Sequence, residues 1–484
     1  MKSPSSFRLL SPEHTSVKAS HVLLVNSMAM WMLAFTTTSI NIALPSIQAE
    51  LDLGAVALGW LPLVYVMASA IFLLPLGKIA DRFGRRLLYL MGLVIFFISS
   101  LALVFADSYV LLVAFRSGQG FGGALMFAGS TAMITLVYPP ERRGRAMGIN
   151  VGVVYLGQTL GPVLGGVIVF NIGWRSLFLI AACYALINLG LDLWLLRRAE
   201  WKDEGATGFD WPGSMAYAIA LGLFLFGLSW LPQVQGLTLI VVGIAGMALF
   251  VWWETRARSP IIEISLFRHN RVFAFSNLAA LISYASVWAM SFLMSLYLQY
   301  IKGLNAQTAG LVLVVGVAFQ ALFSLPSGRL SDRVQPRWVA SGGMALCTIG
   351  LVIFSFLMAD TPYWYIFMGL IVLGLGYAFF STPNQSSIMG SVDRRYVGVA
   401  GASVGTMRLV GQAISIGLAT MILGIIVGTQ TIQPADYPNL LTAIRVTFGM
   451  MAVLCVVGLV ASLARGSMPP HKAPVEGPVP ATEL

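Results

Sequence analysis

The densest group of side chains that could do chemistry is segment 77–86, Gly-Lys-Ile-Ala-Asp-Arg-Phe-Gly-Arg-Arg, which separates two apolar runs. Only water or the lipid headgroup layer can hold these charges beside such runs. Asp81 can accept hydrogen bonds from the N–H groups of a helix start, or pair with arginines. Gly77 and Gly84 permit a tight turn. Such a segment can latch two parts of a protein in one conformation and release them in another. Its candidate gating residues are Gly77, Asp81, Arg82, Gly84, Arg85 and Arg86, with the alternative that Lys78, Arg82, Arg85 and Arg86 only fix the membrane topology.

A later segment, 328–337, repeats this pattern more weakly and also lies between two apolar runs. Four pairs share one offset: Gly77 and Gly328, Asp81 and Asp332, Arg82 and Arg333, and Arg86 and Arg337. The chain is therefore expected to consist of two related halves, each with a charged loop on the same membrane face.

Four charged residues fall within apolar runs: Arg116, Asp192 and Arg408 lie well inside them, and Arg445 lies near the outer end of the last one, where its side chain can reach the membrane surface. A charge at the middle of a bilayer costs at least ~2.5–3.5 kcal/mol on insertion scales. A carboxylate, carbonyl groups or a water-filled cavity must offset that cost for the arginines. A place on a transport pathway and a purely structural bond to helix carbonyls are both open for Arg116 and Arg408.

Small residues recur every four positions at Gly157, Gly161 and Gly165, with Pro162 among them. This spacing gives a smooth stripe on one helix face and permits close backbone approach. Proline bends a helix or relaxes its hydrogen bonding. The stripe is interpreted as a hinge or sliding seam between the halves, with static tight packing as the alternative.

The composition indicates an all-α polytopic membrane protein, because the 484 residues are 58% hydrophobic and 10% charged, with mean hydropathy +0.83. A span needs about 20 apolar residues. Fourteen are predicted: 21–45, 56–76, 87–106, 109–137, 147–170, 176–196, 212–230, 238–253, 272–299, 306–327, 338–358, 363–388, 398–427 and 441–464. The expected organisation is a tail (1–20), a six-helix bundle (21–198), a linker with a two-helix insert (199–255), a second six-helix bundle with the loop leading into it (256–465) and a tail (466–484).

The net charge of +10 reports topology rather than an acidic partner or nucleic acid. All but five of the 29 Lys and Arg residues fall in the tails or in loops of one face, which the positive-inside rule assigns to the cytoplasm together with both termini. The three cysteines lie in apolar runs and the four histidines form no cluster with metal-ligand spacing, so neither disulfides nor a metal site is expected.

Several motifs together resemble the major facilitator superfamily, over nearly the whole chain. Segment 77–86 resembles the signature loop of that family, and Arg116-x-x-Gln119-Gly120 resembles a second family motif. The segment from Gly157 to Gly166 resembles the motif of its proton-coupled exporters. Asn41-Ile-Ala-Leu-Pro resembles a motif near the start of fourteen-span drug:proton antiporters. Phe209-Asp210-Trp211 and the segment from Pro260 to Phe267 also resemble that group.

This resemblance implies a major facilitator fold of two six-helix bundles plus a two-helix insert. It also implies alternating access, with export of amphipathic or cationic drugs against inward proton flow in a bacterial inner membrane. No cofactor is implied beyond the proton gradient. The expected partners are a small amphipathic substrate, protons and membrane lipids, with a monomer as the expected oligomeric state.

The chain departs from the antiporter pattern where an aspartate usually precedes the Asn-x-Ala-Leu-Pro run, because the matching residue is Thr36. A hydroxyl cannot carry a proton load at physiological pH. The candidates for proton coupling are Asp81, Asp192 and Arg116. Asp192 either carries the proton or pairs with Arg197 or Arg198 at the membrane surface.

Polar and aromatic residues within the spans mark a candidate substrate path, with ordinary helix packing as the alternative. They are Trp31, Thr36, Asn41, Trp60, Tyr65, Gln119, Gln158, Tyr284, Trp288, Gln320, Asn384, Gln385 and Arg408. Two apparent enzyme motifs, Gly118-x-Gly-x-x-Gly and Gly401-x-Ser-x-Gly, lie inside spans without the strand context they need, so no enzyme is predicted. Two alternatives remain: an exporter or facilitator of a specific lipid or metabolite without drug:proton coupling, and a non-transporting receptor.

Overall fold

The computed structural model describes residues 17–197, 200–201, 208–231, 233–257, 259–393 and 396–466. Within these ranges the chain is helical, contains no strand, and forms fourteen helical spans long and apolar enough to cross a membrane, which confirms the predicted number. Helices dominate because lipid offers no hydrogen bonds to the backbone. The first bundle contains α1 (Ala19–Leu51), α2 (Ala55–Phe83), α3 (Arg85–Val104), α4 (Tyr109–Val137), α5 (Pro140–Ile172) and α6 (Arg175–Leu195). The insert is α7 (Trp211–Ser229) and α8 (Val234–Glu254).

The second bundle begins after the short helix α9 (Ile264–His269). Its first span runs from Arg271 to Ile301. This span consists of α10 (Arg271–Val287), α11 (Met290–Leu296) and the π-helical turn η2 (Tyr297–Ile301). The remaining helices are α12 (Ala306–Arg333), α13 (Pro336–Ser355), α14 (Tyr363–Gly390), α15 (Val397–Ile426), the 3₁₀ turn η4 (Pro434–Asp436) and α16 (Tyr437–Ala464).

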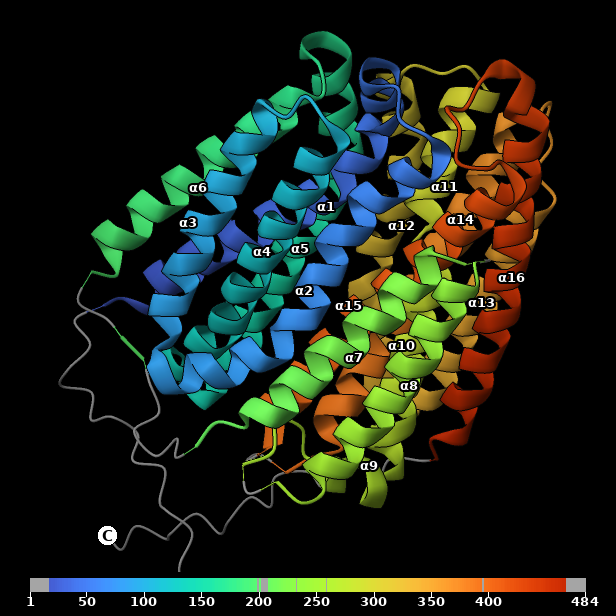
Figure 1. Ribbon diagram of the computed structural model, residues 1–484. Coiled ribbons are helices and arrows are strands. Elements are labelled where there is room, and N and C mark those ends of the chain that lie inside the picture. The colour runs from blue at the N-terminus through green and yellow to red at the C-terminus, as the bar shows by residue number, and fades with distance from the viewer. Residues whose placement is uncertain are drawn as a thin grey trace, which may run out of the picture.

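The two bundles repeat one pattern of helix neighbours, as the repeated segments predict. In the first bundle α1 packs on α5, α2 on α4, and α3 on α4 and α6; in the second, α10 packs on α15, α12 on α14, and α13 on α14 and α16. The bundles meet through two equivalent pairs, α5 with α12 and α2 with α15. Figure 1 shows the blue-to-teal bundle leaning away from the yellow-to-red bundle.

The insert bridges the bundles at their side. Helix α7 contacts α2 of the first bundle and α15 of the second, and α8 packs on α7. The Asp210 carboxylate caps α7 by accepting the Gly213 N–H at 2.9 Å. The Tyr217 hydroxyl donates to the carbonyl of Ala70 on α2 at 3.1 Å, which anchors α7 to the first bundle.

The charged loops are much shorter than segments 77–86 and 328–337 suggested. Helix α2 continues to Phe83 and α3 begins at Arg85, so Gly77 lies inside a helix and only Gly84 forms the turn. Gly84 has φ +121°, a conformation that side chains disfavour, and an added Cβ would lie 2.7 Å from the Glu200 carboxylate. The prediction of a turn at Gly77 is therefore wrong, because backbone hydrogen bonding carries the helix beyond the apolar run.

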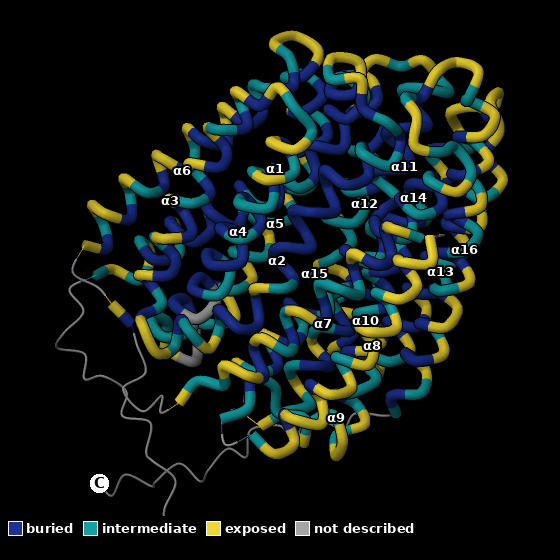
Figure 2. The backbone as a smooth tube through the Cα atoms, in the orientation of Figure 1, coloured by how far each residue is buried: buried dark blue, intermediate teal, exposed yellow. Residues whose placement is uncertain are grey.

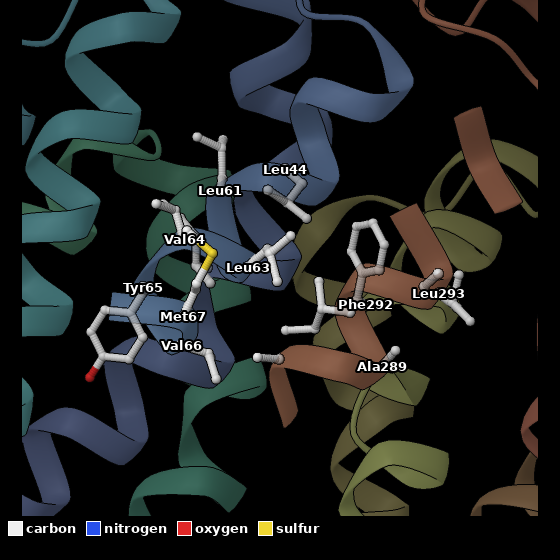
Figure 3. Packing of buried hydrophobic residues seen from close by; sticks show 14 of the residues in the cluster. Leu44, Leu61, Leu63, Val64, Tyr65, Val66, Met67, Ala289, Phe292 and Leu293 are labelled. Atoms are coloured by element: carbon white, nitrogen blue, oxygen red, sulfur yellow. The ribbon is translucent and has the colours of Figure 1, made fainter. Parts of the chain in front are cut away.

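The buried residues lie mainly in the interiors of the bundles and come from all parts of the sequence. The outer faces of α3, α6 and α8 carry many exposed apolar side chains, as expected for lipid contact. Figure 2 marks exposed residues along these helices in yellow. Between the bundles, Leu44 of α1 and Leu63 of α2 lie near Phe292 of α11 in a buried cluster (Figure 3). This apolar contact helps to hold the bundles together at one end.

Candidate substrate pathway and coupling residues

Two adjoining cavities lie between the bundles and share Gln158 and Trp288 in their walls. We call them together the central hollow; its two parts contain about 710 and 610 Å³ of space free of atoms, including space open to solvent. Of the predicted path residues, those that line it are Asn41, Tyr65, Gln158, Trp288, Gln320 and Arg408. The hollow thus draws side chains from both halves of the chain into one site.

The hollow is closed by backbone contact at the end of the bundles opposite segments 77–86 and 328–337. We call the end with those segments the basic end. An added Cβ on Gly310 of α12 would lie 2.1 Å from the Pro162 carbonyl oxygen, and one on Gly166 of α5 would lie 2.5 Å from the Ala306 carbonyl oxygen. The α5–α12 seam is therefore as tight there as two helices allow.

Hydrogen bonds reinforce this closed end. The Ser295 hydroxyl donates to the Asn41 carbonyl at 2.6 Å, and the Gln299 amide donates to the Ile42 carbonyl at 3.2 Å. The Ala55 N–H donates to the Gln430 carbonyl at 3.1 Å, which joins the start of α2 to the loop after α15. Each of these bonds links the first bundle to the second.

The basic end is open along the same helix faces. Gly148 lies about five helical turns before Gly166 on α5, and Gly77 lies about five turns after Gly59 on α2, so each shares a face with its partner. Gly59 is packed against Thr420 of α15, whereas an added Cβ at Gly77 or Gly148 would meet nothing within 4 Å. The bundles therefore separate toward the basic end, and this conformation opens the hollow to that side.

Asp81 is bonded within its own charged segment in this conformation. Its carboxylate accepts from Arg85 Nη2 at 2.7 Å and Nε at 3.0 Å, and both side chains are partly exposed. Arg82 lies over the Phe83 ring at 5.4 Å. Of the two interactions expected for Asp81, pairing with an arginine is the one this state shows; its gating role stays a prediction.

Asp192 pairs with Arg86, and among the described residues it forms no ion pair with Arg197. Its Oδ1 accepts from Arg86 Nε and Nη2, both at 2.8 Å, and both side chains are largely buried. The expected partners follow Asp192 in sequence, but α3 packs against α6 and brings Arg86 to it across the bundle. Arg198 lies outside the described residues. Asp192 does not line the central hollow.

Arg116 is fully buried inside the first bundle, with partners that carry no charge. Its Nε donates to the Leu61 carbonyl at 3.2 Å, its Nη1 donates to Gln119 Oε1 at 2.8 Å, and its guanidinium lies 4.6 Å from the centre of the Tyr65 ring. Gln119 Nε2 donates in turn to the Ser100 hydroxyl at 2.8 Å. This network lies behind the hollow, so Arg116 and Gln119 hold α2, α3 and α4 together.

The other predicted path residues lie away from the walls of the hollow. The Thr36 hydroxyl donates to the Met32 carbonyl at 2.8 Å, and Trp31 stacks on Phe35 with ring centres 5.1 Å apart. Trp60 packs edge-on against Phe226 at 4.9 Å. The remaining three are Tyr284, which contacts the lining residue Tyr377, Asn384, which donates to the Ser276 carbonyl, and the half-buried Gln385.

The glycine stripe of α5 faces α1 of its own bundle, which corrects its interpretation as a seam between halves. An added Cβ on Gly157 would lie 2.7 Å from the Trp31 carbonyl oxygen, and one on Gly161 would lie 1.9 Å from the Thr38 hydroxyl. Gly165 likewise packs on Ser39. Pro162 and Gly166 lie on the adjacent face of α5, and this face packs against α12 of the second bundle. The spacing of residues along a helix decides which face each one occupies.

Sequence reasoning missed several residues that line the hollow: Thr37, Thr38, Phe127, Ser291, Tyr377 and Gln412. Gln412 follows Arg408 by one helical turn, a spacing that could have indicated a shared face. It also missed Arg465, which is buried at the end of α16 and donates to Asn384 Oδ1 at 3.1 Å. Burial lowers the pKa of Arg465 to about 10, so the side chain keeps its charge at neutral pH.

Two bundles of this topology around a central hollow have the architecture of a membrane transporter. The sequence model of the Major Facilitator Superfamily matches residues 27–415 and 276–483, and the chain belongs to this family.

Its relatives include the Riboflavin transporter RibZ of Clostridioides difficile (strain 630), at 29% identity over 80% of this chain and 84% of the relative. The Multidrug resistance protein Stp of Mycobacterium tuberculosis (strain CDC 1551 / Oshkosh) is 28% identical over 83% of this chain and 75% of that protein. The Methylenomycin A resistance protein of Bacillus subtilis (strain 168) is 27% identical over 85% and 89% of the two chains. Transporters associated with resistance are thus well represented among the relatives.

Solved structures show the same fold at low sequence identity. A bacterial homolog of the human lysosomal transporter Spinster, in an inward-facing and unoccupied conformation, matches with TM-score 0.64 and 18% identity over 95% of this chain and 98% of that one. The peptide transporter POT matches with TM-score 0.68 and 15% identity over 92% and 94%. The matching family and these structural neighbours are membrane transporters rather than enzymes.

Proposed function

We propose that this protein exports amphipathic aromatic compounds across a bacterial inner membrane by alternating access. The observation that carries the proposal is the central hollow, which lies between two equivalent bundles, is closed at one end and opens toward the basic end. Trp288, Tyr377 and Tyr65 give it aromatic walls, and such surfaces accommodate flat apolar molecules. The resistance proteins among its relatives support export as the direction.

The basic end is proposed to face the cytoplasm, with both termini on that side. Its support is the concentration of Lys and Arg in loops at that end, the pattern that sets orientation in bacterial membranes. The conformation described here is then inward-facing, with the hollow open to cytoplasmic substrate.

Inward proton flow is the proposed energy source, and the proton is proposed to act outside the substrate walls. No acid is found among the described residues that line the hollow, so Asp81 and the Arg86–Asp192 pair are the candidates that remain close to the basic end. The Arg116 network supports a structural role for that residue instead. One proton moving down 100 mV supplies about 2.3 kcal/mol, enough for a gradient of about 50-fold.

A second candidate function is a facilitator or exporter of one metabolite without proton coupling. Thr36 in place of the expected acid favours it, and so does the lack of an acid among the described residues that line the hollow. The similarity to a protein named as a riboflavin transporter gives an example of a relative associated with a single compound. Its energetics would depend only on the substrate gradient and its charge.

Dye efflux from bacterial cells that express the chain tests both proposals. Cells are loaded with rhodamine 6G or with fluorescein, and efflux is followed with and without a protonophore. Export coupled to protons predicts faster efflux than in empty-vector cells for at least one dye, and loss of that difference with the protonophore. A difference that survives the protonophore selects the uncoupled alternative. Equal efflux in both strains, with the protein present in the membrane, would refute transport of this substrate class.

A further inference from the structure

We propose that the substrate is an aromatic anion, whose carboxylate or acidic phenol pairs with Arg408 in the central hollow. This inference rests on the proposed function and names the charge of what is transported. It narrows the amphipathic or cationic compounds expected from the resemblance to drug:proton antiporters to amphipathic compounds that carry a negative charge.

Arg408 lies within α15 and lines the part of the hollow that also contains Tyr65, Gln158 and Gln412. Its guanidinium lies over the ring of Phe127, 5.0 Å from the ring centre. The ion pairs found among the described residues, Arg85–Asp81, Arg86–Asp192 and Arg175–Glu50, all lie elsewhere. A ring face only partly offsets a guanidinium charge. Arg408 therefore presents hydrogen-bond donors to the hollow.

The contrast with Arg116 shows that Arg408 is not simply a structural arginine. Arg116 is also within a span, but a carbonyl, a glutamine oxygen and the Tyr65 ring surround it, and it does not line the hollow. Arg408 is only half-buried and faces the open space. A charge at this depth is costly, so an arginine facing a transport cavity is expected to serve the pathway.

The walls of the hollow carry one kind of charge. Among the described residues that line its two parts, Arg408 is the only charged side chain. A cationic substrate would meet this positive charge with no carboxylate among the described lining residues to offset it. An anion would gain a charge-assisted hydrogen bond, and a planar fork such as guanidinium suits a carboxylate.

The part of the hollow that does not contain Arg408 has neutral polar residues in its walls. This part indicates what chemical groups the other end of the ligand carries. Asn41 Oδ1 and Gln320 Nε2 are buried without a hydrogen-bond partner among the described residues. One is an acceptor and the other a donor. Trp288 and Gln158 stand where the two parts join. The arrangement fits a flat ring system with an acidic group at one end and a neutral polar group at the other.

The proposal has an electrical consequence. Export of a monoanion in exchange for one proton moves two positive charges inward per cycle. A neutral substrate exchanged for one proton moves one, and a monocation moves none. An anion exporter therefore depends more steeply on the membrane potential than an exporter of cations, and an anion can leave a negative interior even without a proton.

The test measures binding to the purified full-length protein in detergent by the anisotropy of fluorescein. Unlabelled 1-naphthoate and 1-naphthamide, which differ in charge but hardly in shape, are the competitors. We expect naphthoate to compete at least about tenfold better, because only it can pair with Arg408. Equal competition by the two, or no binding of fluorescein, would overturn the proposal without any variant.

Variants of Arg408 then test whether this residue supplies the positive charge that binds the anion. Arg408→Gln should weaken fluorescein binding about tenfold or more, and Arg408→Lys should recover much of it. The matched control is Arg445→Gln, because Arg445 lies in α16 and donates to the Ser355 carbonyl, outside the hollow. Unchanged binding in a folded Arg408→Gln protein, or the same loss in Arg445→Gln, would remove Arg408 from the site.

Flux separates this inference from the proposed function. If rhodamine 6G is exported while fluorescein is neither bound nor exported, the transporter stands and the anion preference is wrong. If fluorescein binds in an Arg408-dependent way but neither dye is exported, the anion site stands and the proposed export of such compounds is wrong. Export of fluorescein that responds to a potassium–valinomycin potential supports both.

Discussion

Arg86 at the start of α3 and Asp192 near the end of α6 form an ion pair inside the first bundle, with Arg86 Nη2 2.8 Å from Asp192 Oδ1. Arg86 also donates from Nη2 to the Asp192 carbonyl at 3.3 Å. The pair thus fixes the basic end of α6 against α3. Its burial makes it a structural bond as well as a candidate for proton coupling.

Asp192→Asn should destabilise the protein by about 3–5 kcal/mol, because it removes the negative charge that pairs with the buried Arg86 guanidinium. The paired change Arg86→Met with Asp192→Leu should recover much of that loss. Unfolding temperature in detergent measures both. If the paired variant is stable and still shows protonophore-sensitive efflux, Asp192 does not carry the proton; loss of coupling with stability kept would support that role.

Asp81→Asn should abolish transport while leaving stability almost unchanged. The Asp81–Arg85 pair is partly exposed and joins residues one turn apart, so it contributes only a few tenths of a kcal/mol. A large loss of efflux would therefore indicate that the Asp81 carboxylate makes an important contact in another conformation, in which it latches the two bundles together. Efflux equal to that of the unchanged protein, at equal membrane abundance, would rule out the latch.

Gly148→Leu should block closure of the basic end without disturbing the conformation described here. Its Cβ would meet nothing within 4 Å in this state, yet it lies on the α5 face that packs on α12 nearer the closed end. We expect efflux to fall at least about tenfold while the unfolding temperature hardly changes.

Gly190→Leu is the matched control for Gly148→Leu. Gly190 lies on α6, is exposed, and also has nothing within 4 Å of its added Cβ. It should transport normally. Equal activity of the two variants would show that this face of α5 does not close.

Gly310→Leu should force the closed end apart, since its Cβ would lie 2.1 Å from the Pro162 carbonyl oxygen. A cysteine placed at Ser291, which lines the hollow, should then become accessible to an impermeant maleimide from the side opposite the basic end. Gly342→Leu, at an exposed position of α13 with nothing within 4 Å, provides the comparison. Unchanged labelling in Gly310→Leu would mean that the α5–α12 seam does not seal the hollow.

The sequence alone predicted the fourteen helices and the repeated halves. Long apolar runs must become helices, because a bilayer leaves the backbone no other partner, and the repeat at Gly77 and Gly328 appears directly in the residues. It also indicated that charges such as Arg116 and Arg408 need an explanation, because a charge deep in a membrane is costly unless neighbouring groups or water offset it. It could not locate the helix ends, since α2 continues through the charged segment to Phe83.

Only the tertiary structure decided what each of those side chains faces. The orientation of α4 about its axis places Arg116 among neutral hydrogen-bond partners, whereas the orientation of α15 places Arg408 at the wall of the hollow. Asp192 meets Arg86 because α3 and α6 pack side by side, although the two residues are far apart in the chain. Which end of the hollow is closed is likewise a property of the packing between bundles, and a pattern along one helix does not contain it.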